Sequence, residues 1–160
     1  MRLILRTLAV LPLLLTLAFV AIPAHASTSI SIQGQFVENS SKQAGCAADF
    51  CGTGILLPLG KATDAGSRST CYETFTLADG SFTTCGTVVS LSCSTMNSSH
   101  ANACGELTGV EESTIVGGTG AFAGASGSLT NTFTIANPNN FPEPGPYSAI
   151  ADYTGTLILP

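Results

Sequence analysis

The stretch that decides the fold is Ser128-Leu129-Thr130-Asn131-Thr132-Phe133-Thr134-Ile135-Ala136. Apolar or amide side chains occupy every second position, and serine or threonine occupies most of the positions between them. Successive side chains of a β-strand point to opposite faces of the sheet, so this period of two predicts a strand with one face turned to a core. Leu129, Asn131, Phe133 and Ile135 would share that inner face.

Similar runs along the chain indicate a protein built of strands. They are rich in Thr, Val, Ile, Phe and Tyr, are separated by Gly, Asn, Asp and Pro, and cover residues 28–36, 71–78, 81–93, 104–116 and 147–159. After residue 26 the sequence has no sustained run of apolar residues at helical spacing. About seven or eight strands in one such chain predict an all-β domain, either a closed barrel or a sandwich.

Two kinds of stretch interrupt this pattern. Residues 39–53 and 60–69 are polar and rich in glycine, so we expect loops there. Residues 137–146 contain four prolines, and proline cannot donate to the ladder of a central strand, which predicts a long connection. Asp79-Gly80, between the runs at 71–78 and 81–93, is typical of a two-residue hairpin turn.

The chain has six cysteines, which are Cys46, Cys51, Cys71, Cys85, Cys93 and Cys104. An even number indicates disulfides if the chain is exported, although six cysteines allow fifteen pairings. Spacing favours 46–51, which closes a small loop, and 93–104, across a polar hairpin tip. The third pair, 71–85, needs a bulge or a shifted turn, because a turn at Asp79-Gly80 places residue 71 opposite residue 88. A structural zinc site is the alternative. It usually needs two closely spaced pairs of cysteine or histidine ligands, and only Cys46 and Cys51 are close in this sequence, so we expect no metal.

The first 26 residues have the three parts of a secretory signal peptide. Arg2 and Arg6 supply positive charge, residues 8–22 are mostly apolar, and Ala24-His25-Ala26 fits the small-residue cleavage site. A transmembrane helix is the alternative, since the apolar run approaches the roughly 20 residues that span a bilayer, but Pro12 and the cleavage site favour removal. We therefore expect a signal peptide at 1–26, one mature domain at 27–160, and a secreted or periplasmic location.

Removal of the signal makes the chain more acidic. Lys42, Lys61 and Arg68 remain against all ten acidic residues, so the formal net charge changes from −5 to −7. Nucleic-acid binding needs clustered Lys or Arg, so that class is excluded, and binding to an anionic membrane is disfavoured for the same reason. His100 becomes the only histidine, and it lies in a predicted polar loop, so we expect no histidine-based nucleophilic apparatus.

A glycine-rich segment, GGTGAFAGASG at 117–127, precedes the strand at 128–136. It partly matches a dinucleotide-binding fingerprint, which requires a helix directly afterwards. No helix can follow here, because Gly124 and Gly127 interrupt the segment and a strand resumes. We interpret it as a tight corner between antiparallel strands, with glycines adopting positive φ and Phe122 inserted as an apolar plug.

At these residues the chain resembles the allene oxide cyclase and dirigent superfamily, whose members carry a Gly-Gly-(Thr/Ser)-Gly-x-Phe-x-x-Ala-x-Gly corner before a late strand. The resemblance continues loosely through residues 149–159, while the cysteine-rich portion at 46–104 departs from the family pattern. It implies a small antiparallel β-barrel of eight strands with an apolar cavity. The corner is structural, so it transfers no catalytic residue to this chain.

Five residues are candidates for a site inside such a barrel. By alternation, Glu73 and Asn131 lie on the apolar faces of their strands, where a buried carboxylate and amide would orient a ligand or act as an acid/base pair. The alternative is that both are exposed, or that they satisfy each other. Tyr147, Tyr153 and Phe133 would line the same cavity and contact the ligand.

These observations favour a non-enzymatic barrel that binds a small apolar or amphipathic ligand without a cofactor. Two alternatives stay open. An enzyme of the cyclase or dirigent kind would act by confining a reactive intermediate, and so would need no catalytic triad. A structural or adhesive extracellular module would need only its exposed threonine rows and acidic charge. The oligomeric state is left open.

Overall fold

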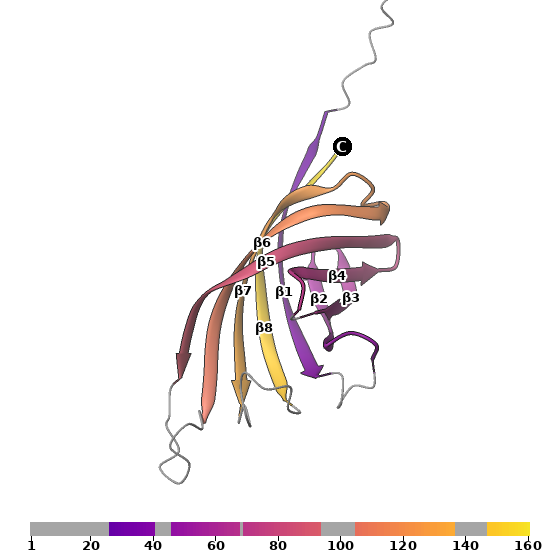
Figure 1. The fold of residues 1–160 in the computed structure, drawn as a ribbon. Coiled ribbons are helices and arrows are strands. Elements are labelled where there is room, and N and C mark those ends of the chain that lie inside the picture. The colour runs from indigo at the N-terminus through magenta and orange to yellow at the C-terminus, as the bar shows by residue number, and fades with distance from the viewer. Residues whose placement is uncertain (1–25, 41–45, 68, 94–104, 137–146) are drawn as a thin grey trace, which may run out of the picture.

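The computed structural model describes residues 26–40, 46–67, 69–93, 105–136 and 147–160. Eight strands follow one another: β1 (Thr28–Ser40), β2 (Phe50–Leu57), β3 (Gly60–Gly66), β4 (Tyr72–Leu77), β5 (Gly80–Cys93), β6 (Glu106–Gly120), β7 (Ser126–Ala136) and β8 (Ser148–Leu159). Each strand pairs antiparallel with the next, and β8 pairs with β1, so the sheet closes into a barrel (Figure 1). The predicted all-β barrel is confirmed.

The strands differ in length, and part of the wall projects beyond the closed barrel. β2, β3 and β4 have 8, 7 and 6 residues, whereas the other five strands have 11 to 15 (Figure 1). β4 pairs with β5 only as far as Tyr72↔Cys85. Within the described ranges, β5 beyond Gly86 pairs with β6 alone, and the consecutive side chains of Val88 and Val89 are both exposed.

Aromatic rings fill the core at the end of the barrel near the β4–β5 turn. Phe36, Phe75 and Phe82 are fully buried. The ring centroid of Phe75 lies 5.6 Å from that of Phe36 and 5.0 Å from that of Phe82. These separations are those of edge-to-face and stacked aromatic pairs, which add to the free energy gained by burying the rings.

The glycine-rich segment forms the corner that the sequence predicts. β6 ends at Gly120, whose φ is 60°, and Gly124 has a φ of 76°, both in the left-handed region that glycine adopts without steric cost. Between them Phe122 is 5% exposed, and its ring centroid lies 5.7 Å from that of Phe82. Phe122 therefore closes this end of the core.

The prediction of loops at 39–53 and 60–69 is wrong for much of both stretches. β1 continues to Ser40, β2 begins at Phe50, and all of β3 lies within the second stretch. The inward positions of β3 are occupied by Ala62, Asp64 and Gly66, which are small or charged. Because the interior is polar at this place, the strand lacks the apolar alternation by which strands are found in a sequence.

The predicted turn between β4 and β5 is wrong by one residue. Leu77 pairs with Gly80, so the two turn residues are Ala78 and Asp79 rather than Asp79 and Gly80. This shift brings Cys71 next to Cys85, and the two form a disulfide, as does the pair Cys46–Cys51. The predicted pairings 46–51 and 71–85 are therefore confirmed. The second forms because the turn is shifted, which is one of the two ways in which the sequence allowed it.

Three further predictions extend beyond the described residues. Cys93 is disulfide-bonded, but its predicted partner Cys104 lies outside the described ranges. The proposed signal peptide is likewise outside them up to residue 25, and so is the predicted connection at 137–146. Nothing helical in the described part of the chain has the length and apolar character of a membrane span.

Candidate functional site

Three acidic residues point into the barrel from three strands: Glu38 of β1, Asp64 of β3 and Glu73 of β4. Gly52 of β2 pairs with both Glu38 and Asp64. A β-carbon at Gly52 would overlap the Asp64 carboxylate and crowd the Glu38 side chain. The missing side chain at Gly52 therefore leaves the space in which the two carboxyl groups meet.

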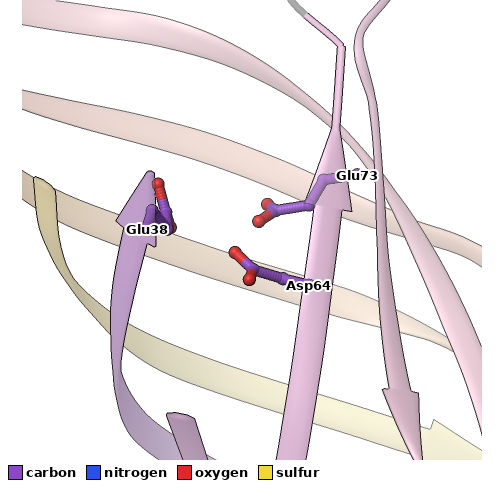
Figure 2. Close-up of side chains that lie close together, drawn as sticks. All are labelled: Glu38, Asp64 and Glu73. Carbon is purple, nitrogen blue, oxygen red and sulfur yellow. The ribbon is translucent and has the colours of Figure 1, made fainter. Parts of the chain in front are cut away.

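The three carboxyl groups form one compact cluster. Each offers an oxygen within 4.8 Å of the others, and Figure 2 shows the groups turned toward a common centre. Their exposed fractions are 6%, 2% and 5% for Glu38, Asp64 and Glu73. Lys61 is the one lysine or arginine among the residues that the structure describes, and its side chain is exposed. Within those ranges no buried lysine or arginine balances the negative charge of the cluster.

Tyr153 of β8 links the two glutamates. Its hydroxyl lies 2.8 Å from an Oε1 atom of Glu38 and 2.8 Å from Oε1 of Glu73. A phenol carries a single hydrogen, so it can donate to one carboxylate and must accept from the other group, which then carries a proton. The hydrogen bonds therefore hold at least one proton in the cluster at neutral pH.

Burial raises the pKa of each carboxyl group in the cluster, which favours the protonated form. Desolvation, and after it the charge of Asp64, raises the pKa of Glu38 from 4.5 to about 8, against the opposing hydrogen bond from Tyr153. Burial also raises the pKa of Glu73 well above its ordinary value, with the charges of Glu38 and Asp64 adding to the effect. Burial raises the pKa of Asp64 as well.

Asp64 is the unsatisfied member of the cluster. Both of its carboxylate oxygens are buried and have no hydrogen-bond partner among the described residues. Burying a polar group without a partner costs about 1–3 kcal/mol. The site therefore contains an acceptor that is turned toward Glu38 and Glu73 and is not used by the protein itself (Figure 2).

A second polar group lies on the neighbouring strands. Asn131 of β7 pairs with Glu111 of β6 on one side and with Tyr153 on the other. The side chain of Asn131 is 5% exposed, and its Oδ1 atom has no partner within the described ranges. Ser113 donates a hydrogen bond of 3.2 Å to Glu111. Burial raises the pKa of Glu111, and this hydrogen bond opposes the rise.

An apolar cluster follows Asn131 toward the end of β7. Leu107, Ile135 and Ala149 are buried there, and the half-buried rings of Phe133 and Tyr147 pack against them. The interior thus changes along the barrel from the aromatic core, through the polar groups around Tyr153, to this smaller apolar cluster.

The structure places the predicted site residues in two neighbouring groups. Glu73 and Tyr153 lie in the carboxyl cluster. Asn131 lies beside it, and Phe133 and Tyr147 belong to the apolar cluster. All five are buried or half-buried, as the strand alternation indicates.

Glu38 and Asp64 are not among the site residues that the sequence predicts. Glu38 follows Ile32 and Phe36 on the same alternating face, so extending the strand by two residues would have found it. Asp64 has no such signal, because its inward neighbours on β3 are Ala62 and Gly66.

The outer wall is also hollowed. One groove of about 650 Å³ crosses β8, β1 and β2, and another of about 580 Å³ crosses β2, β3 and β4. Outward-facing side chains line the first groove, where Gln35 donates a 2.8 Å hydrogen bond to Asp152 beside the exposed Ile55 and Leu57. These grooves lie on the opposite face of the wall from the carboxyl cluster.

Comparison of the chain with family models, curated proteins and solved structures gives no match.

Proposed function

We propose that this protein is a secreted or periplasmic β-barrel that binds a small amphipathic ligand between β6, β7 and β8. The observation that carries the proposal is the buried Oδ1 atom of Asn131, which has no partner among the described residues and lies next to an apolar cluster. Ligand sites combine such apolar walls with a few placed polar groups.

The chemistry of the Asn131 amide and of the apolar cluster beside it defines the ligand class. An amide oxygen accepts hydrogen bonds, so the ligand would present a donor, either a hydroxyl or an amine, to Asn131. Glu111, which pairs with Asn131 across the strands, offers a second acceptor at the same level. An apolar body would lie against Phe133, Ile135 and Leu107, which are the larger side chains of the adjacent cluster.

Exposure of the wall near the site and the disulfides both support this proposal. The projecting part of β5 pairs with β6 alone in the described structure, and its register places Val88 opposite Glu111, so the wall is exposed to solvent near this site. All five cysteines that the structure describes are in disulfides. Disulfides persist in oxidising compartments such as the periplasm and the extracellular space.

A second candidate is an enzyme similar to the cyclases or dirigent proteins that the glycine-rich corner resembles. Tyr153 favours it, because a hydroxyl held between two carboxyl groups of raised pKa is able to take up and release a proton next to a bound substrate. Ligand binding stands first because it needs only the unpartnered acceptor and the apolar wall.

Binding of two matched probes tests the first proposal. 1-Aminoanthracene carries an amine donor and anthracene has the same apolar body without it. Their affinities for the purified protein are measured by fluorescence titration. We expect the amine to bind about fivefold more tightly, as one additional hydrogen bond allows, and Asn131→Leu to remove this difference.

Thr132→Val is the matched control, because Thr132 is the exposed neighbour of Asn131 on the same strand. This variant should keep the preference for the amine. The proposal is overturned if neither probe binds to the unmodified protein, or if Asn131→Leu keeps the same preference.

A further inference from the structure

The carboxyl cluster has the composition of a cation site. We propose that Glu38, Asp64 and Glu73 bind a divalent cation of the size of Ca²⁺ inside the barrel. Carboxylate oxygens are the ligands that hard cations such as Ca²⁺ prefer. The three residues come from three strands of a closed sheet, so the wall of the barrel fixes their separation.

The unpartnered carboxylate of Asp64 is the observation that points to a ligand. Asp64 is 2% exposed, and neither of its oxygens accepts a hydrogen bond from the described residues. Figure 2 shows this carboxylate directed toward the other two rather than toward the wall. A cation between the three groups would satisfy Asp64 and also balance charge that no described lysine or arginine offsets.

The spacing of the oxygen atoms suits a large divalent cation. Three atoms that lie within 4.8 Å of one another leave a central point no more than about 2.8 Å from each, close to the 2.3–2.6 Å of a Ca²⁺–oxygen bond. Mg²⁺ demands shorter bonds in a near-ideal octahedron. Mg²⁺ also keeps several waters and is usually bound by only one or two carboxylates, so three carboxylates in a closed interior favour Ca²⁺.

Two neighbouring residues complete the surroundings of the cation. Gly52 keeps the space between Glu38 and Asp64 free of a side chain. The Tyr153 hydroxyl holds one oxygen of Glu38 and one of Glu73, which leaves the second oxygen of each glutamate for the cation. Tyr153 is in this sense a positioning residue.

This inference goes beyond the proposed function. The three proposed cation ligands come from β1, β3 and β4, whereas the proposed amphipathic ligand lies between β6, β7 and β8. The two are therefore tested separately, and Asn131→Leu should leave cation binding unchanged.

Terbium luminescence tests the site directly. Tb³⁺ replaces Ca²⁺ in oxygen sites and emits when a tyrosine excited nearby transfers its energy to the ion. The chain has no tryptophan and three tyrosines, and of these Tyr153 contacts two of the proposed ligands. After treatment with EDTA, we expect the protein to sensitise Tb³⁺ emission and added Ca²⁺ to displace the ion.

Three variants separate the site from adventitious binding. Asp64→Asn should weaken Ca²⁺ binding, measured by calorimetry, at least tenfold. Asp152→Asn, an exposed acidic residue of the outer wall, should bind Ca²⁺ like the unmodified protein. Tyr153→Phe should lose most of the sensitised Tb³⁺ emission while Ca²⁺ still raises its unfolding temperature, a combination that a failure to fold cannot produce.

Several results would overturn the proposal. They are an absence of Ca²⁺ binding at millimolar concentration, equal affinities of Asp64→Asn and the unmodified protein, and a decrease in Asp152→Asn as large as that in Asp64→Asn. Mg²⁺ should raise the unfolding temperature less than Ca²⁺ at the same concentration, and an equal or larger rise would contradict the assignment to an ion of the size of Ca²⁺.

Discussion

Glu38 and Asp64 lie on strands that do not pair with each other, yet their carboxyl groups meet inside the barrel because Gly52 stands between them. The two residues are 26 positions apart in the sequence. Their meeting depends on the register of β2 with both neighbours and on the absence of a side chain at Gly52.

Gly52→Ala should therefore destabilise the protein. The added methyl group overlaps the Asp64 carboxylate, and overpacking of a filled interior costs about 1–3 kcal/mol. Urea unfolding of the purified variant measures this loss. The same substitution combined with Asp64→Ala should cost less, because the shortened side chain makes room. An equal cost in both backgrounds would contradict the steric argument.

Removal of the Tyr153 hydroxyl should also lower the free energy of unfolding. Tyr153→Phe leaves two buried carboxyl groups without the hydroxyl that links them, at a cost of about 1–3 kcal/mol. Tyr72→Phe is the matched control, because Tyr72 is half exposed on the outer wall, and it should leave stability within error. Equal effects of the two substitutions would show that the link is not stabilising.

Stability should fall as the pH rises from acidic to mildly alkaline values when EDTA removes divalent cations. The pKa of Glu38 is raised from 4.5 to about 8 in the folded protein, so the folded chain keeps a proton that the unfolded chain releases between these values. The stabilisation is complete below pH 4.5 and is lost as the pH approaches about 8.

Urea unfolding at about pH 5, pH 7 and pH 9 measures this dependence. Glu38→Gln, which cannot ionise, should show a flatter profile than the unmodified protein. Glu112→Gln, on the exposed side of β6, should keep the original slope. Parallel profiles for the unmodified protein and Glu38→Gln would contradict the prediction.

The two described disulfides should contribute unequally to stability. Cys71 and Cys85 are 14 positions apart, whereas Cys46 and Cys51 are 5 apart. Loop-closure entropy gives about 3 kcal/mol for the longer loop and about 2 kcal/mol for the shorter. Replacement of each pair by serines, followed by chemical unfolding, measures both losses. A larger loss for the shorter loop would contradict this order.

The strands whose inner faces are apolar could be predicted from the local sequence alone. The alternation at 128–136 correctly placed Asn131 inside the barrel, and the same reasoning placed Glu73 there. Side-chain direction alternates along a strand whatever its partners are, so this information is local. The glycine-rich corner could be predicted equally well, because glycines that allow positive φ and a single phenylalanine are local features of the sequence.

Only the tertiary structure decided which of these side chains meet. β3 carries small and charged residues where the interior is polar, so its pattern resembled a loop and Asp64 was missed. The Ala78-Asp79 turn lies one residue from the predicted place, and such a shift changes which residues of β4 and β5 lie opposite each other. Register depends on turns and on packing across the barrel, and these brought Glu38, Asp64, Glu73 and Tyr153 together.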